Sequence, residues 1–280
     1  EDLFDIYVHP ITWGKTSWLW QDDEERQWID SLLNKTITYT NQSSGKPQYD
    51  VCLQVTIPNE WEKIGSVNIG VTAGIESTQI APQWIEKSML MDKILTISNH
   101  AVESFVNTVY QATNNQTGET FAYKCDKPVE CTHYPVRKVT PKKIKLDLTT
   151  KFNFLTVAQL SPRKNAEQLI KCFIEQFGDN EDVGLIVKAN IAKNSLIDRV
   201  NTIFNFKQIL SQYSDRKCKI YLLHGFLTEE EMAGLYTHPK VKALVSATHG
   251  EGFGLPLFEA AYNSLPVIAT DWSGHLDFLY

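Results

Sequence analysis

The chain has 280 residues, of which 42% are hydrophobic, and a formal net charge of −6 at pH 7. This length and apolar content are sufficient for two domains of ordinary size, each with its own core. The acidic balance argues against a nucleic-acid partner, which would need a clustered basic surface, and no apolar run approaches the roughly 18 residues of a transmembrane segment.

The five cysteines are an odd number at low density, which disfavours a disulfide framework and favours a reducing cytoplasm. Cys125 and Cys131, with His133 close by, are residue types that bind metals, but their spacing fits no common zinc pattern. Free thiols are therefore the preferred interpretation, and we predict no metal. The chain starts without methionine and stops in the apolar run HLDFLY, so we expect a truncated C-terminal end that leaves Leu276, Phe278 and Leu279 exposed unless something covers them.

The first half of the chain alternates predicted strands with polar or helical segments. Residues 4–10 (FDIYVHP) form the first expected strand, and residues 21–34 (QDDEERQWIDSLLN) carry apolar side chains at helical spacing. Three further strands are expected at residues 49–58, 68–74 and 93–98. This alternation is typical of an open parallel sheet, whose strands have their carboxyl ends along one crevice.

Residues 113–145 are polar, contain several prolines and show no sustained period. We expect an irregular excursion followed by an interdomain linker, with the basic run from Arg137 to Lys145 exposed to solvent. The predicted domains are accordingly residues 1–145 and residues 146–280.

The second half begins with an expected strand at residues 151–160, a loop SPRKN and a helix at residues 166–177. A strand at residues 182–190 and another starting at residue 219 follow. Thr228, with Glu231 three residues later, predicts a capping box at the start of the next helix.

The stretch from Val241 to Asp271 combines residue types, spacing and element order that point to one chemistry. Residues 241–247 and 266–270 are expected strands, and Pro256 marks the start of a helix that ends near Asn263. Between them lies the Gly-rich loop THGEGFG. A right-handed βαβ unit of this kind binds its ligand outside the carboxyl ends of the strands, where the free amides of the helix favour an anion.

Glu251 in this loop and Glu259 in the following helix are eight positions apart. Both carboxylates can face a ligand lying across the helix start. Carboxylates bind pairs of hydroxyls rather than phosphate, and a nucleotide-sugar carries sugar hydroxyls on both sides of a central anion. The glycines at 250, 252 and 254 would allow its close approach. Alternatively, the two glutamates are surface charges that the helix dipole favours.

The whole phrase HGEGFGLPLFEAAYNSLPVIAT closely resembles the donor-site signature of family-four (group 1) retaining glycosyltransferases. That family has the B-type fold, an α/β architecture of two Rossmann-like domains with an interdomain cleft. The resemblance implies that Glu251 contacts the transferred sugar and that Glu259 binds the ribose hydroxyls. It also implies donor contacts from the surrounding loop, at His249, Gly252, Phe253, Gly254 and Leu255.

The loop SPRKN resembles the turn whose two cations neutralise the leaving diphosphate in that family. Lys164 matches the lysine, Gln159 stands where the arginine would be, and Arg163 is expected to substitute for it. An ordinary surface turn is the alternative. The resemblance further implies a phosphate contact from Lys188 and a nucleobase held by the turn from Gly225 through Phe226 to Leu227.

On the acceptor side, the resemblance assigns Glu76 and Ser98 to strand ends that face the cleft. Gly14, next to Lys15, would lie near the donor phosphates, although a Gly-Lys pair is also an ordinary loop. Many family members carry a histidine where this chain has Ala73–Glu76. The nearest candidates here are His9 and His100, and a histidine at a strand end is more often structural.

The predicted function is transfer of a hexose from a nucleotide diphosphate sugar to a hydroxyl of a carbohydrate, lipid or protein acceptor, with retained configuration. The sequence contains no Asp-x-Asp to hold a divalent ion, so neither a metal nor another cofactor is expected. Two alternatives stay open: a nucleotide-sugar epimerase of the same fold, and a non-catalytic module that binds nucleotide-sugar.

Overall fold

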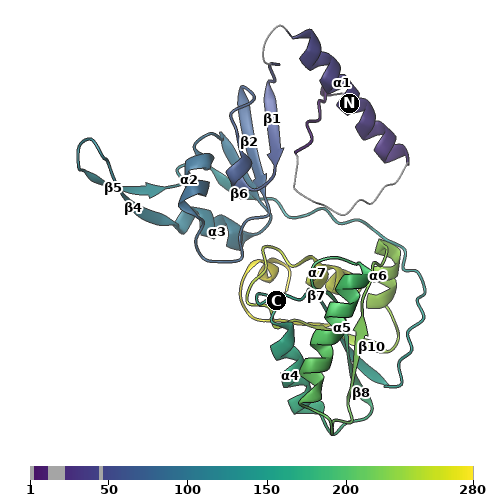
Figure 1. The fold of residues 1–280 in the computed structure, drawn as a ribbon. Helices are drawn as coiled ribbons and strands as arrows, with labels where there is room; N and C mark the ends of the chain where they lie inside the picture. The colour runs from purple at the N-terminus through teal and green to yellow at the C-terminus, as the bar shows by residue number, and fades with distance from the viewer. Residues whose placement is uncertain (1–2, 12–22, 44–46, 280) are drawn as a thin grey trace. The chain divides into compact units, whose positions relative to one another are not determined.

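The computed structural model describes residues 3–11, 23–43 and 47–279 (Figure 1). The chain divides into two compact units. The N-terminal unit comprises Glu1–Cys52 and Ile64–Val67, and the main unit comprises Leu53–Lys63 and Asn68–Tyr280. The domain boundary that we predict between residues 145 and 146 lies between the strands of two sheets described below, and it stays a prediction.

The N-terminal unit is built on the helix α1 (Glu24–Gln42), which begins at the cap Asp23 and confirms the predicted helix. The strand predicted at residues 4–10 is wrong, because this segment forms no strand. Its backbone bonds instead to α1: the Val8 amide donates to Thr36 Oγ1 at 2.9 Å. The Tyr7 ring lies 4.9 Å from that of Tyr39. Apolar alternation here reflects packing on a helix rather than strand pairing.

The first sheet has the strand order β1-β2-β3-β6. Its strands are β1 (Val51–Val55), β2 (Val67–Thr72), β3 (Lys93–Thr96) and β6 (Val129–Cys131), and the last three pair in parallel. The strands predicted in the first half at 49–58, 68–74 and 93–98 are thus confirmed. The short helices η1 (Pro58–Glu60), α2 (Pro82–Ser88) and α3 (Asn99–Asn107) complete this region. Its core contains Trp61, Ile80, Ile85, Met91, Ile94 and Phe105.

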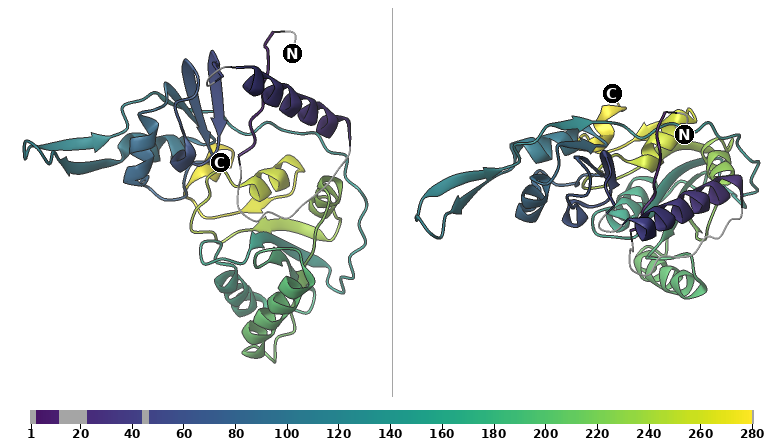
Figure 2. Two further views of the ribbon diagram at one scale, coloured as in Figure 1. Left: turned by 45° about the horizontal axis from the view of Figure 1, so that its top comes forward. Right: turned by 90° about the horizontal axis from the view of Figure 1, so that it is seen from above.

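Residues 113–145 are more regular than predicted. An antiparallel hairpin of β4 (Val109–Thr113) and β5 (Thr120–Lys124) occupies the start, and β6 follows it. In both views of Figure 2 this teal hairpin extends away from the first sheet. Its strands are mostly exposed and so lack an apolar alternation. The hairpin turn depends on Gly118, which has φ of +74°. Beyond β6 the chain forms no helix or strand up to residue 151, which includes the linker predicted to end at Lys145.

The second sheet is parallel throughout, in the order β11-β10-β7-β8-β9. Its strands are β7 (Phe152–Gln159), β8 (Val183–Asn190), β9 (Lys219–Leu223), β10 (Val241–Val245) and β11 (Val267–Ile268), which confirms all five predicted strands of the second half.

Helices cover both faces of the second sheet (Figure 1). They are α4 (Ala166–Phe177), α5 (Leu196–Ser211), α6 (Glu229–Tyr236) and α7 (Leu255–Tyr262), followed by the short helix η2 (Gly274–Asp277). In β8, Leu185 and Val187 pack with α4 and α5, whereas Ile186 packs with α6 and α7. Because both faces are buried, these strands are continuous apolar runs rather than alternating ones.

The apolar C-terminal segment is partly covered, contrary to the expectation that it is exposed. The Phe278 ring lies 5.0 Å from that of Phe253 and 5.2 Å from that of Phe258. Leu279 packs against the core between the second sheet, α6 and α7, and only Leu276 of the three is exposed, at 40%. The segment that contains η2 and Phe278 therefore packs against the Gly-rich loop and the helix α7 that follows it.

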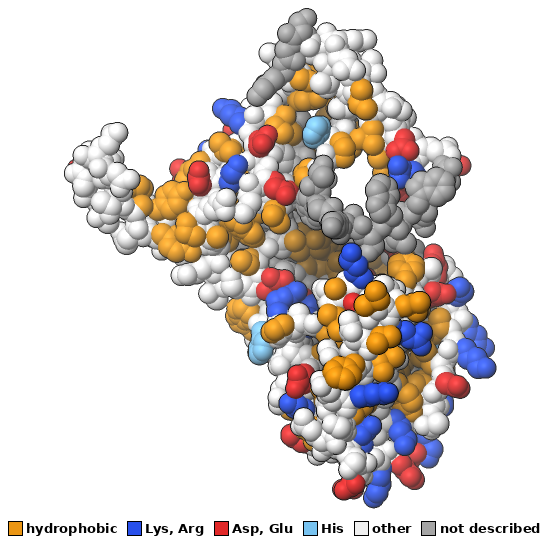
Figure 3. All heavy atoms as spheres, in the orientation of Figure 1, with side chains coloured by type: hydrophobic (Ala, Val, Ile, Leu, Met, Phe, Trp, Pro, Cys, Tyr) orange, Lys and Arg blue, Asp and Glu red, His pale blue; other side chains and the backbone are white. Residues whose placement is uncertain are grey.

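Charged side chains of both signs are interspersed over the elements of the second sheet on the face seen in Figure 3. Several form local pairs, such as Lys151 with Asp182 and Lys171 with Glu167. Among the described residues, no helix combines the length and the apolar character needed to cross a membrane.

Candidate active site

The Gly-rich loop from Thr248 to Gly254 joins β10 to α7 at the carboxyl edge of the second sheet. Gly254 has φ of +92°, a left-handed conformation that favours glycine. A Cβ added at Gly252 would lie 2.8 Å from the Ala73 carbonyl oxygen, and one at Gly250 would lie 2.7 Å from the Glu76 carbonyl oxygen. Glycines at these positions therefore let the loop backbone contact the segment that follows β2.

Glu251 is the buried carboxylate of this loop, with 5% of its surface exposed. Lys164 Nζ donates to one of its oxygens at 2.5 Å, and Arg163 Nη1 donates to the other at 3.3 Å. The backbone of Glu251 is held as well, because its amide donates to Ser273 Oγ at 2.8 Å. A buried charge requires such partners, since an unpaired one would cost several kcal/mol of desolvation.

Arg163 connects three segments around the loop. Besides Glu251, its guanidinium donates to the Gly250 carbonyl oxygen at 2.7 Å and pairs with Glu76 at 3.2 Å. The predicted residues Glu76, Arg163, Lys164 and Glu251 are therefore brought together in one charge network. The predicted substitution of Arg163 for the family's arginine, like the roles of the other three residues toward a ligand, stays a prediction.

A cavity of about 200 Å³ opens beside this network, at the carboxyl ends of β7 and β8. The cations Lys164 and Lys188 line it, together with Gln159, Asn190, Asn194 and Pro256 at the start of α7. Ligand pockets usually measure about 300–1,000 Å³, so this cavity is smaller than a typical pocket for a whole ligand. Its two lysines and the helix start favour an anion.

Glu259, the second carboxylate of the motif, has different surroundings. It lies on α7, and the Tyr236 hydroxyl of α6 donates to it at 2.9 Å. Burial of the carboxylate raises the pKa of Glu259, and this outweighs the opposing effect of the Tyr236 hydrogen bond. The residue as a whole is nevertheless exposed.

Lys188 holds the turn that follows β9. Its Nζ donates to the Gly225 carbonyl oxygen at 2.5 Å, and burial lowers its pKa. Gly225 has φ of +117°, so this turn also needs a glycine. The side chain of the adjacent Phe226 is 58% exposed, whereas Leu227 packs against the core.

Sequence reasoning missed a buried hydrogen bond beside this turn, between Asp198 at the start of α5 and His224, which directly follows β9. The His224 Nε2 and Asp198 Oδ1 atoms are 2.8 Å apart, and the Asp198 carboxylate also accepts from the amides of Ile191, Ala192 and Lys193. Burial acts to raise the pKa of Asp198, but hydrogen bonds from Lys193 and His224 hold it well below 3.8. One sequence signal was available: Asp198 lies three residues after Ser195, a spacing typical of the first turn of a capped helix.

Other predicted residues serve local structure or are exposed. Ser98 is fully buried and caps α3, accepting from the Ala101 amide at 3.1 Å. His249 and Leu255 are exposed, and Phe253 is buried. His9 is exposed, whereas His100 contacts the Trp272 ring and its buried Nε2 has no hydrogen-bond partner among the described residues. Gly14 lies outside the described residues.

A family model described as "Glycosyl transferases group 1" matches residues 138–279, slightly more than half of the 280-residue chain. The chain belongs to this family. The match covers all strands of the second sheet and the whole Gly-rich loop. The resemblance to group 1 glycosyltransferases that the motif indicates is therefore confirmed.

Among curated proteins, this group 1 glycosyltransferase is similar to the serotype-specific mannosyltransferase WbdA of Escherichia coli. The two are 31% identical over 119 residues, which is 42% of this chain and 13% of WbdA. The chain therefore spans only a small part of the length of this relative.

Solved structures show the same fold at low identity. The N-terminal domain of trehalose-6-phosphate phosphatase from Candida albicans aligns with a TM-score of 0.52 at 11% identity, covering 92% of this chain and 63% of that one. The α,α-trehalose 6-phosphate synthase of Burkholderia multivorans aligns with a TM-score of 0.52 at 10% identity, over 76% of this chain and 54% of that one. The predicted B-type α/β fold of glycosyltransferases is confirmed.

We predict that Lys164→Gln destabilises the protein by about 1–3 kcal/mol, because it leaves the buried Glu251 carboxylate short of a partner. The double variant Lys164→Gln/Glu251→Gln should regain most of this loss, since two amides replace two charges. Urea unfolding measures both, with the exposed Lys151→Gln as the control. A double variant no more stable than Lys164→Gln would contradict the pairing.

The Asp198 network predicts a pH dependence of stability. A carboxylate whose folded pKa is lowered stabilises the protein above its ordinary pKa of about 4 and loses this contribution as the pH falls. Asp198→Asn should therefore be less stable than the native chain by about 1–3 kcal/mol at pH 7, with a smaller difference at pH 3. Urea unfolding at both pH values tests this, and the exposed Asp215→Asn should differ little from native at either. A constant difference for Asp198→Asn would contradict it.

Proposed function

We propose that this protein transfers a hexose from a nucleotide diphosphate sugar to an acceptor hydroxyl, with retention of configuration. The observation that carries the proposal is the buried Glu251, paired with Lys164 and Arg163 at the edge of the cavity that Lys188 also lines. Two cations that already meet at a helix start suit a diphosphate, and a carboxylate between them suits the hydroxyls of the sugar attached to it.

Binding of the donor would rearrange the charge network. Without a ligand, the two cations neutralise Glu251, which is 5% exposed and cannot stay unpaired. In the complex, Lys164 and Arg163 would turn to the diphosphate oxygens, and sugar hydroxyls would donate to Glu251 in their place. The carboxylate thus keeps hydrogen-bond partners in both states, so the exchange leaves no buried charge unsatisfied.

In the chemical step, the bond between the anomeric carbon and the diphosphate oxygen breaks as the acceptor oxygen bonds to the same face of that carbon. The acceptor proton passes to a leaving phosphate oxygen, so the protein need not supply a nucleophile. Negative charge grows on the diphosphate during this step. Lys164, Arg163 and the amides of residues 252–255 would stabilise it, because fixed cations and dipoles cost no reorganisation at that moment.

The remaining predicted residues would position the rest of the donor and the acceptor. Glu259 would accept from the ribose hydroxyls, and the turn that Lys188 holds at Gly225 would border the nucleobase. Glu76 orients Arg163 through their ion pair at 3.2 Å and, in this proposal, faces the acceptor. Ser98 caps the first turn of α3. In this proposal it positions that helix rather than contacting the donor directly.

The donor sugar is proposed only as a hexose. Mannose is the first to test, because the similar protein WbdA is a mannosyltransferase. Purified protein should be incubated with a panel of nucleotide diphosphate sugars, and both nucleotide release and sugar identity should be measured. Release of nucleotide diphosphate supports transfer, whereas an isomerised nucleotide-sugar without release would indicate an epimerase. Donor binding without either product would indicate a non-catalytic module.

The two motif glutamates should have separable roles. Glu259→Ala should weaken binding of free nucleotide diphosphate by about 2–4 kcal/mol, because a charged hydrogen-bond acceptor for the ribose is lost. Glu251→Gln should preserve that affinity and reduce turnover instead. Calorimetry with free nucleotide, plus rates from the release assay, distinguishes the two; exposed Glu175→Gln on α4 is the control. Equal losses of nucleotide affinity in both variants would contradict the division of roles.

Activity should persist when magnesium and manganese are removed. Lys164, Arg163 and the start of α7 would neutralise the diphosphate in place of a hard divalent ion, which would require oxygen ligands. The release assay should be run with chelator alone and with added Mg²⁺ or Mn²⁺. Activity that chelation abolishes and Mg²⁺ or Mn²⁺ restores would refute this assignment of the phosphate site.

A further inference from the structure

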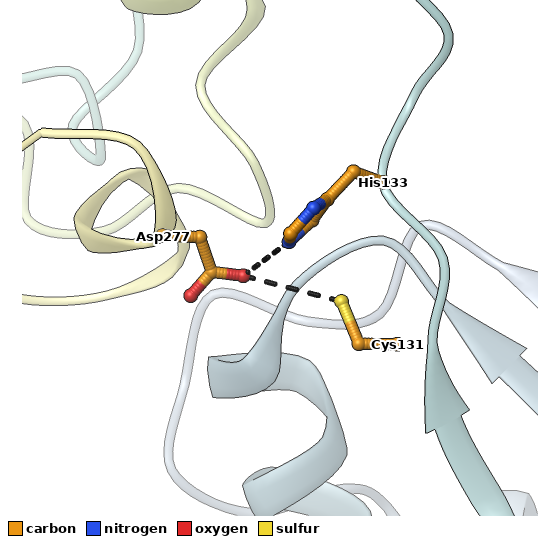
Figure 4. A group of neighbouring side chains, drawn as sticks. All are labelled: Cys131, His133 and Asp277. Atoms are coloured by element: carbon orange, nitrogen blue, oxygen red, sulfur yellow. Dashed lines mark hydrogen bonds and ion pairs between the residues drawn. The ribbon is translucent and has the colours of Figure 1, made fainter.

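Three side chains of metal-binding type meet outside the charge network (Figure 4). Cys131 ends β6, His133 follows two residues later, and Asp277 lies in η2, 144 residues further along the chain. Asp277 Oδ2 lies 2.9 Å from His133 Nε2 and 4.0 Å from Cys131 Sγ. One ligand atom from each residue lies within 4.8 Å of the other two.

The fold explains why these residues meet. The strand β6 pairs in parallel with β3, and the Thr132 amide continues the ladder by donating to the Thr96 carbonyl oxygen at 2.7 Å. The helix α3 starts directly after β3, and its Asn99 amide donates to Asp277 Oδ2 at 2.8 Å. The ends of β6 and β3 thus lie at one sheet edge, against η2. All these contacts fall on Oδ2, but a carboxylate offers about four lone-pair sites, so Asp277 can hold this amide and an ion together.

The ligand set matches one class of metal. Thiolate, imidazole and carboxylate together suit Zn²⁺, whereas Mg²⁺ and Ca²⁺ prefer oxygen alone. In a tetrahedral zinc centre the ligand atoms lie about 3.3–3.7 Å apart. Here the nitrogen–oxygen separation of 2.9 Å must open slightly and the sulfur–oxygen separation of 4.0 Å must close slightly. The separation between the Cys131 sulfur and the His133 nitrogen is within 4.8 Å and must also approach this range.

We propose that Cys131, His133 and Asp277 form a zinc-binding site with three protein ligands and a water in the fourth position. The His133 side chain is 49% exposed, which leaves a route for the ion and room for the water. The Asp277 side chain is 9% exposed and so is held in place. This proposal replaces the expectation of free thiols for Cys131 only, and Cys125 is not part of the cluster.

Binding of the ion exchanges a proton. The Cys131 thiol must lose its proton to bind the ion as a thiolate. Zn²⁺ forms its bond to sulfur and displaces this proton to solvent, with no oxidation or reduction.

The ion would tie η2 to the segment after β6, and both lie against the Gly-rich loop. Ser273, just before η2, accepts through Oγ from the Glu251 amide. Gly274, the first residue of η2, donates its amide to the Glu251 carbonyl oxygen at 2.9 Å. On the other side, the rings of His133 and Tyr134 lie 5.9 Å and 5.4 Å from that of Phe253. The proposed role is structural, and it does not depend on the proposed reaction.

Titration of the metal-free 280-residue chain with Co²⁺ tests the site directly. Co²⁺ replaces Zn²⁺ in such centres, and a cysteine ligand produces a thiolate-to-cobalt charge-transfer band in the near ultraviolet. We expect this band with one ion per chain and its loss when Zn²⁺ is added. Native chain without the band would overturn the proposal, whatever the variants do.

Variants assign the ligands. Cys131→Ser should abolish the band, and Asp277→Asn, which keeps an acceptor for the Asn99 amide, should weaken Zn²⁺ binding by about tenfold or more. Cys125→Ser and Cys172→Ser are matched controls that should bind as the native chain does. Zn²⁺ should also raise the Tm of the native chain but not that of Asp277→Asn. A band that survives in Cys131→Ser, or disappears in Cys125→Ser, would overturn the assignment.

Discussion

The candidate site depends on a carboxylate that is buried before any ligand arrives. Glu251 is 5% exposed and is held in place by hydrogen bonds from Lys164 and Arg163. Because a buried charge must have partners, this requirement joins the loop after β7 to the loop after β10. Arg163 extends the connection to Glu76, so one network links the ends of strands in both sheets.

The same network explains the glycines around it. The loop that carries the buried carboxylate packs closely against neighbouring backbone, and a Cβ at Gly274 would lie 2.0 Å from the Gly252 carbonyl oxygen. Close backbone contact brings the helix start of α7 to the cavity, where its free amides favour an anion. Glycine spacing, charge pairing and the anion site are therefore consequences of one packing arrangement.

The second sheet was predictable because its residues are governed by local rules. Strands buried on both faces are apolar runs, and the capping box at Thr228 and the Pro-containing start of α7 are short-range signals. Where local patterns were ambiguous, prediction failed. Residues 4–10 alternate like a strand but pack on α1, and the exposed hairpin β4–β5 carries no apolar period.

The sequence by itself determined the parallel α/β elements and the positions of the motif residues, because these follow from spacing along the chain. It also indicated the family, through the resemblance of the motif to the donor-site signature. Only the tertiary structure decided which side chains from distant parts of the chain come into contact. Asp198 with His224, Arg163 with Glu76, and Cys131 with Asp277 are 26, 87 and 146 positions apart. No periodicity relates such residues, since their contacts arise when separate strand ends reach a shared sheet edge or loop.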